Sequence, residues 1–166
     1  MLTRNTATEL YQETGTSSGH SHTITAGANV VFVALMTNFG VDDPSATYGG
    51  VAMTLIGNVE NDTDAEVNWF RLLNPAAGAQ AVAVSWTSSR ANLVVAVDFS
   101  GAHPTDPDGT VFTATGSSRF PSVGVTGTEL PRGELIMDAV SHSTGSSADV
   151  GSGQTAINTT QFPGRC

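Results

Sequence analysis

Residues 68–101 constrain the fold of this chain more strongly than any other stretch. They read NWFRLLNPAAGAQAVAVSWTSSRANLVVAVDFSG, in which three runs of β-branched and aromatic residues are separated by two short turn sequences. Proline and glycine mark the first turn, at residues 74–78, and a serine-rich segment at residues 88–90 marks the second. The stretch therefore predicts three consecutive antiparallel strands, around which the rest of the chain is organised.

Side chains in these strands follow the period of two that a strand requires. Residues 67–73 are largely apolar on both faces, which predicts a strand in the interior of a sandwich. Residues 80–86 and 92–100 alternate, so we expect one set of their side chains to point into the core. That set is Val82, Val84, Trp86, Leu93, Val95, Val97 and Phe99. Asp98 then lies on the opposite face, in solvent or bonded to a neighbouring backbone group or Arg71.

Strand patterns of the same kind occur before and after this stretch. Gly49-Gly50 between two short strand-like runs is a hairpin signal, because a type I′ turn needs positive φ at both central positions. There is no amphipathic helical pattern of useful length. Further strands are predicted at residues 20–25, 29–37, 47–48, 51–56, 110–114, 122–127, 134–141 and 154–158. The sequence therefore predicts an all-β fold, an antiparallel two-sheet sandwich of jelly-roll or immunoglobulin-like type.

One domain with short appendages accounts for the 166 residues. Residues 1–19 are polar, so we expect a polar N-terminal arm, with a short strand or one helical turn at residues 9–11. The β-sandwich domain is predicted to span residues 20–158. Residues 159–166 form a C-terminal tail that holds the only cysteine, Cys166, which is expected to be chemically incidental.

Charge and composition exclude several classes of function. The formal net charge is −9 and every cationic residue is an arginine, so neither a nucleic acid nor an anionic membrane surface is an expected partner. The N-terminus lacks the apolar core of a signal peptide, and no stretch approaches the roughly 20 apolar residues of a membrane span. These features predict a protein that is made in the cytoplasm.

A histidine pair is the first candidate metal site. His20 and His22 lie two residues apart, which on a strand places both imidazoles on one face, where they could share a metal ion. A third ligand would have to come from elsewhere, and His103 and His142 are available. The favoured alternative is that both residues are exposed polar side chains of an edge strand.

Loop carboxylates are the second candidate, because Ca²⁺ prefers several oxygen ligands. The candidates are Asp62, Asp64, Glu66, Asp106 and Asp108. The EF-hand loop needs glycine at its sixth position, and this chain has Val67 there when counted from Asp62. Solvated acidic loops are therefore favoured, and no metal or cofactor is expected.

Two further motifs invite a functional interpretation. Residues 15–19, GTSSG, match the G-x-S-x-G pattern of a nucleophile elbow, and His20 follows. That elbow requires a strand-to-helix turn in an α/β sheet, which this sequence does not predict, so a hydrolase is not expected. Trp69 and Trp86 would form a sugar-stacking platform if exposed, but both are in phase with valines and are expected in the core.

Three motifs of the sandwich region are similar to a known type of module. They are ATYGGVAMT at residues 46–54, WFRLLNP at residues 69–75 and VDFSG at residues 97–101. Together they resemble β-sandwich modules of phage and prophage virion proteins, which also occur in bacterial surface proteins. The resemblance covers about residues 20–158 and rests on turns and core strands, so it implies a fold but no catalytic residues.

The resemblance implies a non-enzymatic virion structural protein. The first expectation is a capsid decoration (cement) protein on the capsid surface, made in the host cytoplasm, that bridges the major capsid protein or other virion subunits and forms a homo-oligomer such as a trimer. The alternative is a receptor- or glycan-binding adhesion module of a phage tail or bacterial surface. Similar modules usually continue through another strand pair after residues 154–158, so either residues 159–166 fold back or one sheet edge is left open. An open edge is expected to be completed by, or packed closely against, a neighbouring subunit or capsid lattice.

Overall fold

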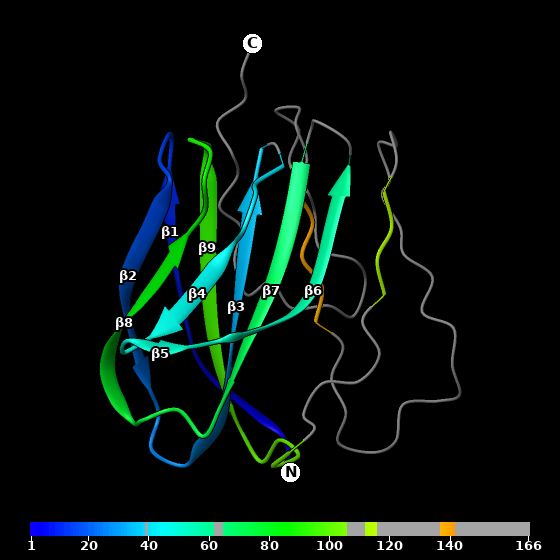
Figure 1. Ribbon diagram of the computed structural model, residues 1–166. Coiled ribbons are helices and arrows are strands. Elements are labelled where there is room, and N and C mark those ends of the chain that lie inside the picture. Colours follow the sequence, from blue (N-terminus) through cyan, green and yellow to red (C-terminus); the bar gives the residue numbers. More distant parts are fainter. Residues whose placement is uncertain (39, 62–64, 106–111, 116–136, 142–166) are drawn as a thin grey trace.

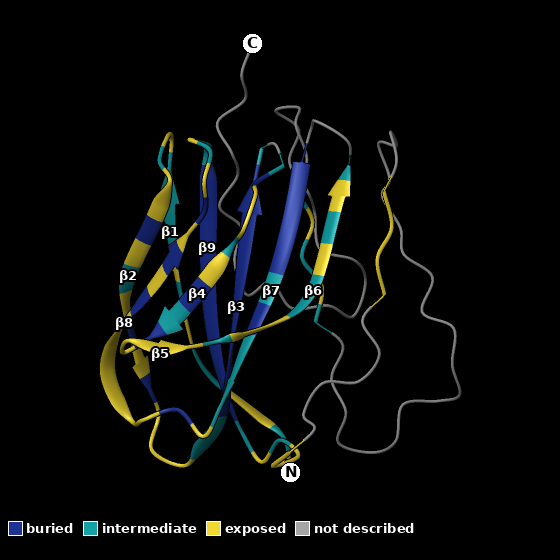
Figure 2. Ribbon diagram, viewed as in Figure 1, coloured by how far each residue is buried: buried dark blue, intermediate teal, exposed yellow. Residues whose placement is uncertain are grey.

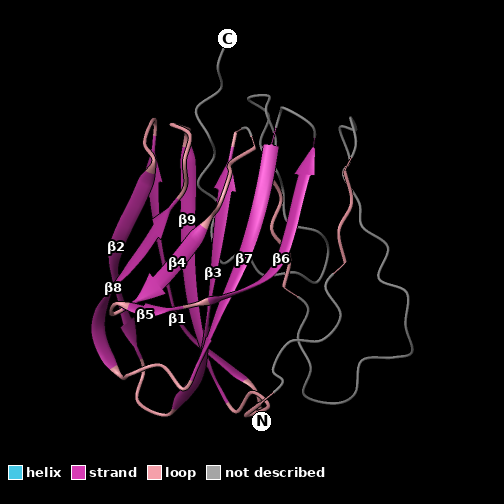
Figure 3. Ribbon diagram, viewed as in Figure 1, coloured by secondary structure: helices cyan, strands magenta, loops and turns pink. Residues whose placement is uncertain are grey.

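Every regular element in the described part of this protein is a β-strand. The computed structural model describes residues 1–38, 40–61, 65–105, 112–115 and 137–141. Two antiparallel sheets pack against each other, and no helix occurs among these residues (Figures 1 and 3). The strands are β1 (Thr3–Gln12), β2 (Ser17–Ile24), β3 (Ala28–Thr37), β4 (Ser45–Tyr48), β5 (Val51–Ala52), β6 (Thr54–Asn61), β7 (Ala65–Leu73), β8 (Gly78–Ser85) and β9 (Asn92–Ser100). The predicted all-β sandwich is confirmed.

The connectivity is that of a jelly roll. The chain runs outward through β1 to β4, turns at Gly49-Gly50 and returns, so that β1 pairs with β9, β2 with β8, β3 with β7 and β4 with β5. This paired ribbon is rolled up, because β9 also pairs with β3 and β8 also pairs with β4. The result is a five-stranded sheet, β1-β9-β3-β7-β6, and a four-stranded sheet, β2-β8-β4-β5. Strand β6 is an addition at the edge beside β7.

The predicted central block is split between the two sheets. Strand β7 lies in the five-stranded sheet, β8 crosses to the four-stranded sheet, and β9 returns to the first. The three strands are consecutive in sequence but are not neighbours in space, which corrects the sequence-based expectation. The cause is the rolled ribbon, in which each returning strand pairs with a distant outgoing strand rather than with its successor.

The core between the sheets is apolar and continuous. Val82 and Val84 of β8 and Trp86 just after it point into this core as predicted, and Phe70 of β7 faces them from the other sheet. Burying each such side chain stabilises the fold by roughly 1.5–3 kcal/mol. The buried set is Ile24, Val31, Val33, Leu35, Val41, Ala46, Tyr48, Phe70, Val82, Val84, Trp86, Val94 and Ala96.

The outer face of the five-stranded sheet is apolar and buried as well. Figure 2 shows that β9 and most of β3 are buried along their length. Four β9 side chains that were predicted to face the inter-sheet core lie on this outer face instead: Leu93, Val95, Val97 and Phe99. Val94 and Ala96 face the other sheet. The alternation in β9 was right but its phase was wrong, because both faces of this strand are covered and either set of side chains satisfies the pattern. Met137 and Ala139 are among the residues that cover the outer face.

The N-terminal segment is part of the sandwich. Residues 1–19 were predicted to form a polar arm, yet β1 is a ten-residue strand at one edge of the five-stranded sheet, and β2 already begins at Ser17. The polar composition of β1 reflects its edge position, since none of its residues is fully buried. Because these residues are only weakly hydrophobic, their sequence did not predict the full strand, which backbone pairing with β9 holds in place.

Other predicted strands have mixed outcomes. The β9 bounds and the hairpin at Gly49-Gly50 are confirmed. Residues 51–56 form two strands in different sheets rather than one. Residues 112–114 and 137–141, the described parts of two predicted strands, have no strand structure. The strands predicted at 122–127 and 154–158, and the open edge expected near the C-terminus, lie outside the described residues.

A substitution at Gly50, at the tip of the β4–β5 hairpin, tests the assigned turn. Gly50 has φ of +80° and a Cβ added there would meet no atom within 4 Å, so substitution costs only backbone strain. We expect Gly50→Val to lower the free energy of unfolding by about 1–2 kcal/mol in urea titrations, because a β-branched residue disfavours positive φ. Gly50→Asn should cost less, and Ala52→Val in the same hairpin should be nearly neutral. Equal stability of Gly50→Val and wild type would contradict the assigned turn.

Candidate functional site

A buried carboxylate lies where β1, β2 and β9 meet. Asp98 of β9 points toward the four-stranded sheet and is fully buried. Its Oδ1 accepts a hydrogen bond from the backbone amide of Thr6 at 2.9 Å. Its Oδ2 accepts from the amide of Thr25 and from the Asn5 side chain, both at 3.1 Å. One carboxylate therefore joins β1, the residue after β2, and β9.

A bulge in β1 makes this contact possible. The pairing of β1 with β9 shifts register between Arg4 and Ala7, so Asn5 and Thr6 stand outside the ladder. A bulge frees backbone groups from strand pairing. The freed Thr6 amide would be an unsatisfied donor at the edge of the core, and the Asp98 carboxylate supplies its acceptor.

Two histidines complete this polar cluster. The Nε2 atom of His22 lies 3.3 Å from Asp98 Oδ1, within ion-pair distance, and both side chains are fully enclosed. The Nδ1 atom of His22 lies 2.8 Å from the Thr8 hydroxyl, and Nε2 of His20 lies 2.9 Å from the same hydroxyl. A threonine hydroxyl has one proton, so it donates to one imidazole and accepts from the other when both rings are neutral. We call Thr8, His20, His22 and Asp98 the β1 latch.

Burial keeps both imidazoles neutral at neutral pH. Desolvation lowers the pKa of His22, and the nearby Asp98 carboxylate opposes this shift without cancelling it. Desolvation also lowers the pKa of His20, and the neighbouring His22 lowers it further, while Thr8 and Glu9 act in the opposite direction. Tyr48 closes the cluster on the β4 side, where its hydroxyl donates to Gly78 O at 2.8 Å and burial raises its pKa.

A hydroxyl, an imidazole and a carboxylate in line are also the parts of a hydrolytic triad. In this cluster the Thr8 hydroxyl lies between two imidazoles, and His22 and Asp98 are sealed from solvent. A nucleophile needs a reacting atom within about 3 Å and a path for substrate to reach it. The described pocket is lined by other residues, so the geometry favours a structural role for the latch.

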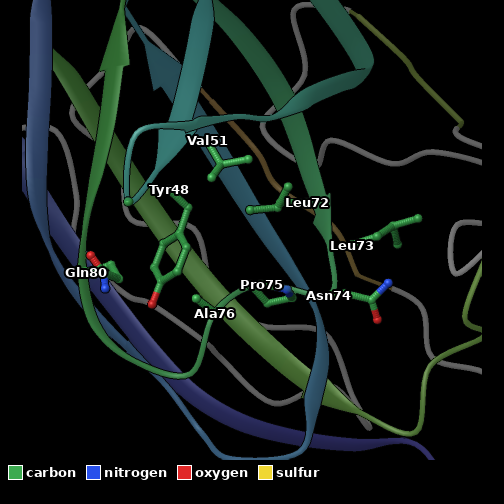
Figure 4. A pocket seen from close by; sticks show the side chains of 9 residues that line it. Tyr48, Val51, Leu72, Leu73, Asn74, Pro75, Ala76 and Gln80 are labelled. Carbon is green, nitrogen blue, oxygen red and sulfur yellow. The ribbon is translucent and has the colours of Figure 1, made fainter.

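The pocket lies at the end of the sandwich, between the β4–β5 hairpin and the turn from β7 to β8 (Figure 4). Its volume is about 150 Å³. Val51, Leu72 and Pro75 give it an apolar lining, and Asn74 and Gln80 are polar residues in its wall. It contains no titratable side chain besides the buried Tyr48, so it offers no acid–base chemistry near neutral pH.

A second buried carboxylate fastens the loop before β4. Glu66 of β7 is only 2% exposed and accepts hydrogen bonds from the amide of Val41 at 2.5 Å and from the side chains of Asn58 and Asn68 at 2.5 and 2.8 Å. The sequence placed Glu66 in a solvated acidic loop, and this interpretation was wrong because β7 begins at Ala65. All these partners are protein groups, so Glu66 acts as a structural acceptor.

Only some of the metal candidates lie among the described residues. His20 and His22 share one face of edge strand β2 as predicted, but the expectation that both are exposed was wrong, because His22 is fully buried and His20 is half-buried. Among the described residues, no group of three His, Cys, Asp or Glu side chains is placed to hold a metal ion. His103 is exposed on a separate loop. The remaining candidates, Asp62, Asp64, Asp106, Asp108 and His142, lie outside the described residues, as does Cys166.

The other sequence motifs are placed as follows. Ser17 of the GTSSG motif begins a strand, is exposed and pairs with Ser85 of β8, so it has neither the helix nor the histidine contact of a nucleophile elbow. Trp86 is buried between the sheets, and Trp69 is half-buried on the outer face of the five-stranded sheet. Asp98 was expected in solvent or bonded to neighbouring backbone, and the second of these alternatives is the observed one.

The outer face of the four-stranded sheet is exposed and carries no charged or aromatic side chain. Strand β8 contributes only alanine and serine to it, paired with serine, glycine and threonine of β2 on one side and with β4 on the other. We call this surface the flat face. Its residues are Ser17, Gly19, Ser21, Thr23, Ser45, Thr47, Ala52, Ala79, Ala81, Ala83 and Ser85. Gly19 keeps it flat, since a Cβ there would lie 2.9 Å from the carbonyl oxygen of Val82.

Sequence reasoning found the histidine pair but missed its partners. Asp98 is far from β2 in sequence, whereas Thr8 lies only 12 and 14 residues before the two histidines, and the pairing of β1 with β9 brings Thr8 and Asp98 together beside β2. The alternation predicted for residues 80–86 is the one signal of the flat face in the sequence, and the extent of this face over three further strands depends on the sheet order.

Comparisons with models of protein families, with curated proteins and with solved structures found no match. The part of the chain that the structure describes also contains no helix long and apolar enough to cross a membrane. The observations that bear on function are therefore the fold, the β1 latch and the flat face.

Replacing the central carboxylate tests the structural role of the latch. We expect Asp98→Asn to lower the free energy of unfolding by about 3 kcal/mol, because the amide group presents N–H donors to the donors of Thr6 and Thr25. Urea unfolding followed by circular dichroism gives the value. Asp43→Asn, an isosteric change at an exposed position, should be nearly neutral. A loss below about 0.5 kcal/mol for Asp98→Asn would contradict the assigned network.

The histidines also make stability depend on pH. The unfolded chain binds protons at His20 and His22 near pH 6.5, and the folded chain binds them only at lower pH, because burial lowers both pKa values. The free energy of unfolding should therefore fall as pH drops from about 6.5 toward the folded pKa values, and these two groups should contribute no slope above that window. Urea titrations from pH 7.5 to 5 measure this slope. His103→Gln should retain it, and a flat profile in the wild type would refute the expectation.

Proposed function

We propose that this protein is a non-enzymatic structural protein of a virion, which decorates the capsid and stabilises the coat by bridging neighbouring subunits. The observation that carries this proposal is the flat face. A sheet surface of small, uncharged side chains lets another protein surface approach closely, and it requires no charged group to be desolvated. The partner class is the major capsid protein or another virion subunit.

The architecture supports the proposal by analogy. Jelly rolls occur in viral capsid proteins and also in lectins and cupins, so the fold alone does not decide among these functions. The cupin-like alternative needs a metal-binding cluster, and the described residues of this chain form none. The resemblance of the three sequence motifs to phage virion modules points in the same direction as the fold.

The distribution of charge supports the same proposal. The chain carries a formal net charge of −9, and none of this charge lies on the flat face. Acidic groups elsewhere favour solubility before assembly, while the uncharged face is free of electrostatic repulsion when it docks. Binding to the assembled coat alone would then stabilise that coat by linkage, to a degree set by the concentration of the protein relative to its dissociation constant.

The adhesion alternative has less support. A glycan site needs an exposed aromatic ring beside polar groups. Trp86 and Tyr48 are buried, and Trp69 is half-buried against the outer-face clusters. Phe112 is exposed, but it has no hydroxyl or ring nitrogen to orient a sugar. The two tryptophans, which were the main sequence evidence for an adhesion module, therefore serve in packing.

A charge placed on the flat face tests the proposal. We expect Ala83→Arg to reduce cosedimentation with capsids at least tenfold, because the bulky cation lies in the middle of the face and cannot be desolvated without a partner. The capsids are those of the phage or prophage whose genome encodes the chain. Thr54→Arg, an exposed strand position on the other sheet, is the matched control.

The outcomes separate docking from folding. Both variants should keep wild-type circular dichroism and wild-type urea midpoints, since both positions are exposed. Wild-type binding by Ala83→Arg would overturn the role of the flat face. Failure of the wild-type protein to associate with the particle, and its absence from purified virions, would overturn the proposed function itself.

A further inference from the structure

Strand β1 is held in place more by polar contacts than by apolar burial. Its ten residues include none that is fully buried, whereas β9 beside it is buried along nearly its whole length. Besides the ladder with β9, the side-chain contacts of β1 include Asn5 and Thr6, which bind Asp98, and Thr8, which binds the two histidines. Tyr11 adds apolar packing against the outer-face cluster that contains Leu93 and Val95. The strength of this edge therefore depends on the hydrogen-bonding state of the β1 latch.

Protonation of the histidines is incompatible with the latch. The Thr8 oxygen lies within 2.9 Å of a nitrogen on each ring, so those two nitrogens are less than about 6 Å apart. When both rings are protonated, every ring nitrogen is a donor, and the Thr8 proton loses its acceptor within the cluster. Two positive rings at this separation also repel each other in a partly buried place.

The surrounding charges compensate only one of the two rings. Asp98 of β9 lies beside His22 and is sealed from water. Glu9 of β1 is the carboxylate that acts on His20, and it is exposed, so solvent weakens its effect. Tyr48 of β4 contributes a neutral phenol that binds backbone carbonyls. A doubly protonated cluster therefore holds a half-buried positive charge on His20 that has no buried counter-charge among the described residues.

We propose that the β1 latch is an acid-sensitive switch, in which protonation of His20 and His22 releases β1 from the edge of the sandwich while the remaining strands stay folded. Departure of β1 lets water reach both imidazoles, so they are protonated more readily in the open form than in the closed form. Because burial lowers both pKa values in the closed form, acid shifts the equilibrium toward opening.

Release of β1 has a structural consequence. Strand β9 would lose one of its two neighbours and expose a row of backbone donors and acceptors from Asn92 to Ser100. An open edge of this kind accepts another strand, so the released form is competent for strand addition. The inference does not rest on the proposed virion function, since it concerns the fold alone.

Hydrogen exchange of the full chain tests the switch. Protection factors, corrected for the intrinsic rate at each pH, are measured at pH 7.5 and pH 5.0 for the amides that join β1 to β9 and for the Thr6 amide. We expect the protection of β1 to fall at least tenfold at pH 5.0, because both imidazoles bind protons more readily in the open form than in the closed form. Amides between β3 and β7 should keep their protection.

The matched variant keeps the hydrogen bonds and removes the titration. In His20→Gln with His22→Asn, the side-chain amides reach the positions of Nε2 and Nδ1 that contact Thr8. This double variant should show the same β1 protection at both pH values, whereas His103→Gln should respond to acid like the wild type. If the double variant does not fold, His20→Gln alone should reduce the acid response, because one titrating ring remains.

Three results would overturn the proposal. The first is wild-type β1 protection that does not change between the two pH values. The second is an undiminished acid response in the variant that lacks one or both rings. The third is equal loss of protection in β1 and in the β3–β7 pair, which would show global acid unfolding instead of release of one strand.

Discussion

The buried Asp98 carboxylate is the interaction on which one side of the sandwich depends. A fully enclosed carboxylate is costly unless several donors face it, and here the donors come from a bulge in β1 and from the residue after β2, with the His22 ring within ion-pair distance. These groups belong to different sheets, so the carboxylate joins the five-stranded and four-stranded sheets at an edge where apolar packing is sparse. Its removal would leave backbone amides unsatisfied on both.

Glu66 and Tyr48 likewise bind polar groups inside the protein. Glu66 fastens a loop, Tyr48 binds two backbone carbonyls, and both carboxylate clusters are satisfied by protein groups. The flat face, by contrast, presents only small side chains to solvent. A sandwich whose buried carboxylates bind protein groups and whose exterior carries a smooth, uncharged face suits a protein that acts by docking, and it underlies the proposal of a capsid-decorating role.

Local patterns predicted the strands well and their partners poorly. The bounds of β9 and the Gly49-Gly50 hairpin follow from β-propensity and turn chemistry, which act within a few residues. The phase of β9 did not follow, because both of its faces are buried. Asp98 is an acid in an alternating strand, and its donors at Asn5 and Thr6 lie more than 90 residues away. Such contacts depend on the rolled ribbon, which no local pattern encodes.

The protonation of His22 connects the interior network to the behaviour of β1. In the folded protein, the His22 imidazole is neutral and enclosed between Thr8 and Asp98. The most direct measurement is the titration of the His22 ring nitrogens by long-range ¹H–¹⁵N correlation NMR. We expect the pKa of His22 to lie below the ordinary histidine value of about 6.5, so that the ring is neutral at pH 7. A pKa at or above the ordinary value would show a solvated or charge-stabilised ring and would contradict this expectation.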